Sequence, residues 1–202
     1  MRKNILCALL AFQAASAIAG GSATITCGNA PPGVYNNGQV PQLTINYTPG
    51  VDAGAPGLFW LGVLSPDQNS GAVMTQQGWA TYQGGLYPFQ ARYDNGLPGT
   101  VTLTIPFPVD PQSGTLSTAG FVGFSVYAGH GVYTQQAQQL VANRRAMLNS
   151  VRAQRIAAGT WQADYDTDDR FIWSVIQKNM VENNKFGALI TVPFIDCTLP
   201  QN

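Results

Sequence analysis

The stretch GFVGFSVYAGHGVYTQQAQQLVANRRAMLNSVRAQRIAAG, residues 120–159, decides the fold because its periodicity changes from that of a strand to that of a helix. Apolar residues alternate over the first ten positions and predict one strand face, made of Val122, Phe124, Val126 and Ala128. Thr134 then has the position of an N-cap, and Gly159 that of a C-terminal stop. We therefore expect a β-rich body to end here and a helical layer to begin.

Upstream of this stretch, short β-like runs are separated by turn residues. The run LFWLGVL (58–64) is apolar throughout, which predicts a strand buried on both faces. Asn95-Gly96 lies between the runs at 88–93 and 101–107, and such a pair predicts a hairpin because both residues tolerate positive φ. Pro106 predicts that the second of these runs is an edge strand or that its ladder ends there, since proline has no N–H to donate.

Downstream, the chain predicts two helices and a final strand. The first helix has an apolar stripe into which Arg144 and Arg155 project, together with Leu140, Val141, Met147, Leu148 and Val151. The second helix begins at Thr167 as N-cap, and the last strand lies within 185–197. The expected fold is a β-rich α+β domain: an antiparallel β-sandwich or barrel-like body, with two helices in the C-terminal half packed on it and a last strand returning to the first.

The N-terminus has the pattern of a secretory signal peptide. Arg2 and Lys3 precede an uncharged, mostly apolar run, and small residues follow up to Ala19. This order predicts cleavage after Ala19, which leaves residues 20–202 as one secreted domain. The apolar run is too short for a bilayer span of about 20 residues, and no membrane span is expected after signal removal.

Two cysteines follow the signal, Cys27 near the start of the domain and Cys197 near its end. In an exported chain such a pair predicts a disulfide. Closing a loop of about 170 residues would stabilise the fold by about 5 kcal/mol at most. The alternative, two free thiols for redox or metal chemistry, lacks a close CxxC spacing and a second histidine.

Charge is sparse, with ten basic and ten acidic residues in the whole chain. Without a basic surface, nucleic acid and anionic lipid are not expected partners. One histidine and one glutamate do not make a usual zinc site, and no phosphate-binding or dinucleotide glycine motif is present. No cofactor is therefore expected, apart from the calcium alternative at the acidic run 164–169.

His130, the chain's one histidine, stands between Gly129 and Gly131. An exposed imidazole beside a helix N-terminus could act in catalysis, with an aspartate from the 164–169 run as its partner. No serine lies in a GxSxG elbow, so a nucleophile is missing. The alternative is a strand-to-helix turn in which the glycines supply backbone freedom.

The run DYDTDD (164–169) is the densest group of acidic residues. Asp164, Asp166 and Asp168 have the alternating spacing that begins a calcium-binding loop, although the glycine and the glutamate of the EF-hand pattern are missing. The alternative is that the run caps the second helix and pairs with the first helix, which carries Arg144, Arg145, Arg152 and Arg155.

Aromatic residues beside glycine and glutamine are candidates for a binding surface for neutral sugars or a protein partner, namely Trp79, Tyr82 and Tyr87. Trp60, inside a continuous apolar run, is predicted to be core.

These features predict a secreted, non-enzymatic protein that binds or assembles with a protein or glycan at the cell envelope, in the periplasm, on the cell surface or outside the cell. The competing hypothesis is an exported hydrolase that uses His130 with an aspartate of the 164–169 run. The sequence leaves the oligomeric state open.

Overall fold

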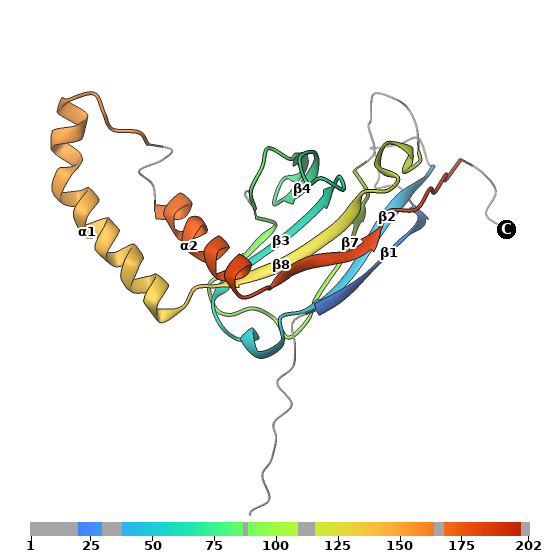
Figure 1. Ribbon diagram of the computed structural model, residues 1–202, viewed down its shortest axis with the longest axis horizontal. Coiled ribbons are helices and arrows are strands. Elements are labelled where there is room, and N and C mark those ends of the chain that lie inside the picture. Colours follow the sequence, from blue (N-terminus) through green and yellow to red (C-terminus); the bar gives the residue numbers. More distant parts are fainter. Residues whose placement is uncertain (1–19, 30–37, 87–88, 109–115, 164–167, 199–202) are drawn as a thin grey trace, which may run out of the picture.

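The computed structural model describes residues 20–29, 38–86, 89–108, 116–163 and 168–198. They form a β-rich α+β fold of two antiparallel sheets with two helices in the C-terminal half (Figure 1). The first sheet has the order β1 (Gly20–Asn29), β2 (Gln39–Thr48), β7 (Val101–Pro106). The second has the order β5 (Gly78–Thr81), β4 (Gly71–Thr75), β3 (Gly57–Leu64), β8 (Ser125–Val132), β9 (Phe186–Thr191), with β6 (Ala91–Tyr93) also paired to β3. The other elements are the short 3-10 turns η1 (Gly50–Asp52) and η2 (Ala119–Phe121) and the helices α1 (Gln135–Ala157) and α2 (Asp168–Glu182).

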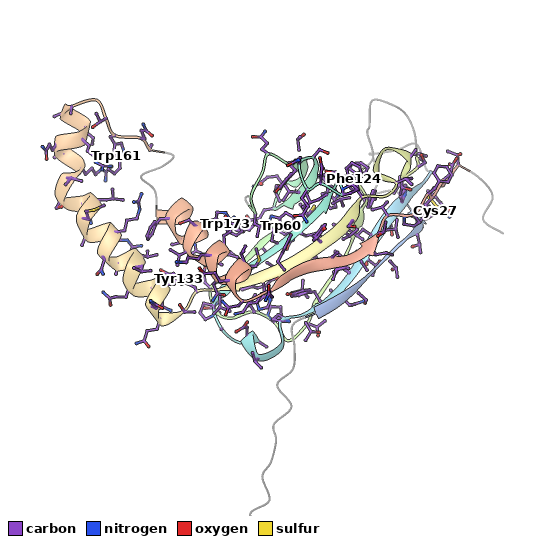
Figure 2. The ribbon with its side chains drawn as sticks, viewed as in Figure 1. Cys27, Trp60, Phe124, Tyr133, Trp161 and Trp173 are labelled. Atoms are coloured by element: carbon purple, nitrogen blue, oxygen red, sulfur yellow. A yellow bond between two sulfur atoms is a disulfide. The ribbon has the colours of Figure 1, made fainter. Side chains whose placement is uncertain are left out.

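Strand β3 is buried on both faces, as its sequence predicts. Phe59, Leu61 and Val63 face the first sheet and belong to the core between the two sheets. Leu58, Trp60 and Leu64 face the opposite way, into a second core that α2 covers with side chains such as Trp173 (Figure 2). The molecule therefore has three layers, in the order small sheet, large sheet and helix.

The Cys27–Cys197 disulfide joins β1 to the chain that follows β9. The bond links residues 170 positions apart, which confirms the predicted pairing. The last strand does return to the first, because β9 lies beside β1, but its hydrogen-bonded neighbour is β8. β1 and β9 are thus the facing edges of two different sheets.

The predicted Asn95-Gly96 hairpin is wrong. The strand before it, β6, pairs with β3 in the large sheet, while β7 after it pairs with β2 in the small sheet. The intervening chain crosses between the sheets, and Leu97, which is buried, exchanges two backbone hydrogen bonds with the 54–55 segment. The buried Leu97 therefore holds the crossing segment in place, and the strands on either side of Asn95-Gly96 do not pair with each other. β7 is an edge strand, as Pro106 predicts.

The predicted strand near residue 120 begins later and ends later than expected. β8 starts at Ser125, so Val122 lies outside it and is exposed. The strand continues through Val132 because it pairs with β3 over its full length. His130 therefore lies inside a strand, which corrects the prediction of an exposed turn.

Helix α1 begins as predicted, with the Thr134 side chain accepting a hydrogen bond from the Ala137 N–H. The expected apolar stripe is only partly correct. Val141 and Leu148 are buried, whereas Leu140 and Met147 are exposed. The reason is that α1 packs on α2 and stands off from the sheets, while α2 packs on β8 (Figure 1).

Candidate functional site

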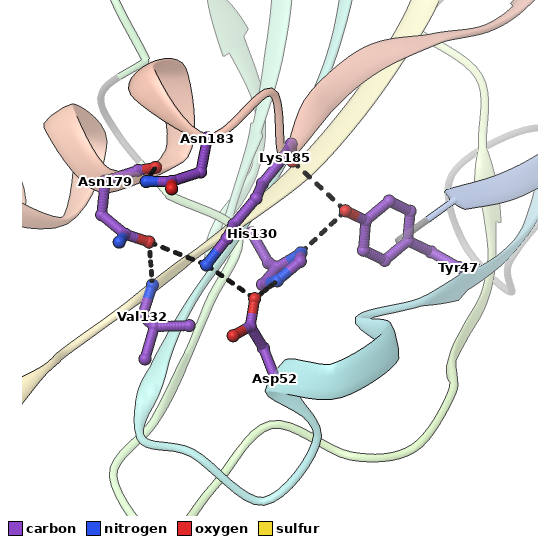
Figure 3. Close-up of polar contacts among 7 residues, drawn as sticks. All are labelled: Tyr47, Asp52, His130, Val132, Asn179, Asn183 and Lys185. Carbon is purple, nitrogen blue, oxygen red and sulfur yellow. Dashed lines mark hydrogen bonds and ion pairs between the residues drawn. The ribbon is translucent and has the colours of Figure 1, made fainter. Parts of the chain in front are cut away.

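A buried polar cluster surrounds His130 where β2, η1, β8 and the end of α2 meet (Figure 3). The imidazole is fully buried, with 0% of its surface exposed. Its Nδ1 lies 2.8 Å from the Tyr47 hydroxyl, and its Nε2 lies 2.8 Å from Oδ2 of Asp52. The cluster thus brings together side chains that are far apart in the sequence.

Lys185, in the turn between α2 and β9, completes the cluster. Its ammonium lies 2.7 Å from Oδ2 of Asp52 and donates a 3.2 Å hydrogen bond to Oδ1 of Asn179. The same Asn179 oxygen accepts a hydrogen bond from the Val132 N–H. The Lys185 carbonyl accepts from the His130 N–H, and the Tyr47 hydroxyl oxygen lies 3.2 Å from the same carbonyl oxygen. One turn therefore ties α2 to both sheets.

The glycines beside His130 are required for close packing. A Cβ on Gly131 would lie 2.3 Å from Cγ2 of Ile176 and 2.5 Å from its carbonyl oxygen, because the α2 backbone lies directly on β8. A Cβ on Gly129 would lie 2.6 Å from the Lys185 carbonyl. Neither glycine has the positive φ that the predicted strand-to-helix turn would need. The pair lets the α2–β9 segment approach the strand while His130 points to the opposite face.

Burial and charge set the protonation of the cluster. Burial lowers the pKa of His130, opposed by its hydrogen bond and attraction to Asp52, and repulsion from Lys185 lowers it further. Burial alone would raise the pKa of Asp52, but hydrogen bonds from Lys185 and His130 outweigh it and hold that pKa below its ordinary value. Burial also raises the pKa of Tyr47. At neutral pH the cluster therefore holds a carboxylate, an ammonium, a neutral imidazole and a neutral phenol.

These states assign the imidazole tautomer. Asp52 can only accept, so His130 Nε2 carries the proton and donates to it, while Nδ1 accepts from the Tyr47 hydroxyl. A catalytic base in a triad uses its second nitrogen to take a proton from a nucleophile. Here Tyr47 occupies that nitrogen, and no surface of the ring meets solvent. The arrangement suits a structural network better than proton transfer to a substrate.

The carboxylate partner of His130 is not an aspartate of the 164–169 run, as the hydrolase hypothesis expected. The structure pairs the ring with Asp52, from the PGVDAG turn after β2. Asp164 and Asp166 lie outside the described residues, and Asp168 begins α2 with a side chain that is not described. The calcium alternative and the pairing of this run with the arginines of α1 therefore stay predictions. Within the described ranges, no group of three or more His, Cys, Asp or Glu side chains could hold a metal ion.

The arginines of α1 contact aromatic rings. The Arg144 guanidinium lies 4.7 Å from the centre of the Phe171 ring, and that of Arg152 lies 5.3 Å from the centre of the Trp161 ring. Arg144 and Arg155 are half-buried, as their position in the apolar stripe predicts. Cation–π contacts of this kind help to hold α1 against the segment that follows it.

The predicted aromatic surface is divided between two cores. Trp79 is half-buried against the core between the sheets, and its indole N–H donates to the Pro106 carbonyl. Tyr82 packs against the core under α2. Tyr87 lies outside the described residues. Because the two cores lie on opposite faces of the large sheet, Trp79 and Tyr82 do not form one continuous patch.

Among the described residues, two surface cavities lie close to the features above. One, of about 270 Å³, lies between the facing edges of β1 and β9 and has Tyr47 and Lys185 in its lining. The other, of about 330 Å³, lies between α1 and α2, with Ala137, Leu140 and Val175 as its apolar lining and Lys178 and Glu182 among its polar lining. The second is the larger of the two, and its apolar lining includes the exposed Leu140.

Sequence reasoning missed Tyr47, Asp52, Asn179 and Lys185. Each belongs to a different stretch of ordinary composition, and nothing in its spacing points to His130. One signal was available in the sequence. Charged residues are few in this chain, so Asp52 and Lys185 could have been singled out as candidates for a specific contact.

No family model, no curated protein and no solved structure matches this chain. In the described part of the chain, no helix has both the length and the apolar character needed to cross a membrane.

Proposed function

We propose that the chain is exported and acts at the cell envelope or outside the cell, as a non-enzymatic protein that binds or assembles with a protein partner through its helical arm, α1 and α2. The observation that carries this proposal is the pair Leu140 and Met147. Both are about half exposed, at 47% and 49%, and a spacing of seven residues places them on one face of α1. An apolar surface beside a polar rim is the usual composition of a protein interface.

The groove between the helices supports the same proposal. Leu140 and Val175 lie on its two walls, and Lys178 and Glu182 stand at its rim. Two helices that leave such a groove between them can accept a third amphipathic helix. Glycan binding has less support, because Trp79 and Tyr82 are half-buried in separate cores.

Export rests on two further observations. The segment 1–19 has the composition of a signal peptide. The Cys27–Cys197 disulfide is typical of oxidising compartments such as the periplasm or the exterior.

The hydrolase hypothesis has weaker support. The His130 ring is closed off from solvent, and both of its nitrogens have partners within the fold. A substrate would reach the ring only if Tyr47 moved away from it.

A pull-down with two matched double variants tests the proposal. Residues 20–202 are immobilised and exposed to the envelope and secreted proteins of the native host. We expect Leu140→Asp/Met147→Asp to lose a partner that the wild-type protein retains. The control, Ala142→Asp/Asn149→Asp, has the same spacing and added charge on the opposite, exposed side of α1, and should keep the partner. Equal retention by both variants, with circular dichroism showing intact helices, would remove the support for the arm as the binding surface.

A further inference from the structure

We propose that His130, Asp52 and Lys185 form an acid-operated latch, in which a proton taken up by His130 displaces the Lys185 ammonium from Asp52. The inference rests on the geometry of the cluster and does not depend on the proposed function.

Two donors, one of them a permanent cation, share one oxygen of Asp52. Oδ2 of Asp52 lies 2.8 Å from Nε2 of His130 and 2.7 Å from Nζ of Lys185. While the imidazole is neutral, one carboxylate balances one ammonium. Once the imidazole is charged, two positive groups compete for one negative oxygen in a poorly solvated site, where repulsion between them is only weakly screened.

The cluster has a place for the extra proton. The proton binds at Nδ1 of His130, which then donates to the Tyr47 oxygen. The Tyr47 hydroxyl turns its own hydrogen to the Lys185 carbonyl, which already lies 3.2 Å away. Each donor in this series of hydrogen bonds therefore keeps an acceptor. The imidazolium can form without leaving a buried polar group unsatisfied.

Lys185 is the group that leaves the carboxylate. The charged or titratable side chains that face His130 in the described structure are Tyr47 from β2, Asp52 from η1 and Lys185 from the α2–β9 turn. His130 has no exposed surface. Asp52 and Lys185 are similarly exposed, at 19% and 16%, but Asp52 has a short side chain on η1, whereas the Lys185 ammonium ends a flexible four-carbon stem. An ammonium is strongly hydrated, so Lys185 is the group that can exchange its partner for water.

The consequence is a local rearrangement at the junction of α2 and β9. Release of the ammonium breaks its contacts to Asp52 and to Asn179. It also places a free positive charge beside the 270 Å³ cavity between β1 and β9, which Lys185 helps to line. Acid would thus change the charge of this cavity while the sheets stay intact.

NMR titration of residues 20–202 from pH 8 to pH 4 tests the latch directly, because the imidazole signals can only come from His130. We expect the His130 ring, the Lys185 side chain and the Asn179 side-chain amide to shift with one common midpoint. In Lys185→Met the His130 midpoint should move to higher pH, because the competing cation is gone. Lys178→Met, which removes an exposed ammonium from α2, should leave the midpoint unchanged.

Two results would overturn the latch. One is a His130 ring that stays neutral until the protein unfolds. The other is a ring that titrates while the Lys185 and Asn179 signals stay still. Both are read from the wild-type protein, so the test holds even if Lys185→Met does not fold.

Discussion

Nε2 of His130 and Oδ2 of Asp52 lie 2.8 Å apart although 78 positions separate the two residues in the chain. The contact joins the turn after β2 in the small sheet to β8 in the large sheet. Lys185 reaches the same oxygen from the end of α2, so a single carboxylate connects all three layers of the fold. The chain's one histidine therefore takes part, through Asp52, in a contact that joins the three layers.

Replacing Asp52 by Asn should destabilise the protein by about 1.5–3 kcal/mol, the range for hydrogen bonds to charged groups. The amide cannot balance the Lys185 ammonium, which is only 16% exposed. Urea unfolding at pH 7 measures the loss. Asp94→Asn is the matched control because Asp94 pairs with Arg92 at the surface, and it should change stability by less than about 0.5 kcal/mol. Equal effects of the two variants would contradict the connecting role of Asp52.

The stability should fall as the pH drops below about 6.5, the ordinary pKa of histidine. Burial lowers the pKa of His130, so below that pH the unfolded chain binds a proton that the folded protein resists, and folding becomes less favourable. The lowered pKa of Asp52 acts in the same direction: its contribution is complete above about pH 3.8 and is lost as the pH falls through the folded-state pKa.

Urea midpoints at pH 8, 7, 6 and 5 measure this dependence. His130→Gln retains a donor for Asp52 but does not titrate, so its midpoint should change less between pH 7 and pH 5 than that of the wild type. Parallel curves for the two proteins would show that another group is responsible.

Gly131→Ala should weaken the docking of α2 on β8. The added methyl group would lie 2.3–2.5 Å from atoms of Ile176, one of them a backbone oxygen that cannot rotate away. Overpacking of this kind costs about 1–3 kcal/mol. Gly187→Ala in β9 is the control, since nothing lies within 4 Å of the Cβ position there. If thermal unfolding shows no difference between the variants, the explanation of the two glycines is wrong.

Removing the disulfide with Cys27→Ser/Cys197→Ser should cost about 2–5 kcal/mol. The bond closes a loop over 170 positions and fastens the facing edges of the two sheets at one end. Chemical denaturation of the double variant measures the loss. Wild-type protein treated with a reductant should unfold at the same denaturant concentration as the variant, and a reduced protein as stable as the oxidised one would contradict this role.

Much of the architecture could be predicted from local patterns. The unbroken apolar run of β3 indicated burial on both faces, Pro106 indicated an edge, and Thr134 indicated where α1 begins. Each of these signals is local. It depends either on the chemistry of one residue, such as the missing N–H of proline, or on the pattern of apolar residues next to it in the sequence. The terminal disulfide could also be predicted, since the domain has two cysteines.

The candidate site could not be predicted in this way. The packing of one sheet on the other brings Asp52, Tyr47 and Lys185 to His130. Packing between sheets leaves no repeating pattern in the sequence, so these contacts could not be predicted from it. The glycines beside His130 suggested a turn, because the sequence cannot show that Ile176 comes to lie against Gly131. Leu140 and Met147 were expected to be buried for a similar reason, since the stripe does not show how far α1 stands off from the body.

Site-specific photo-cross-linking in the native host tests the proposed function most directly. A photoreactive amino acid is placed at Leu140 in one strain and at Asn149, on the opposite side of α1, in another. The account predicts a discrete cross-linked product of the exported protein at position 140 and none at position 149. Absence of any product at position 140, in a strain that exports the folded protein at its normal level, would contradict the claim that the arm holds a partner.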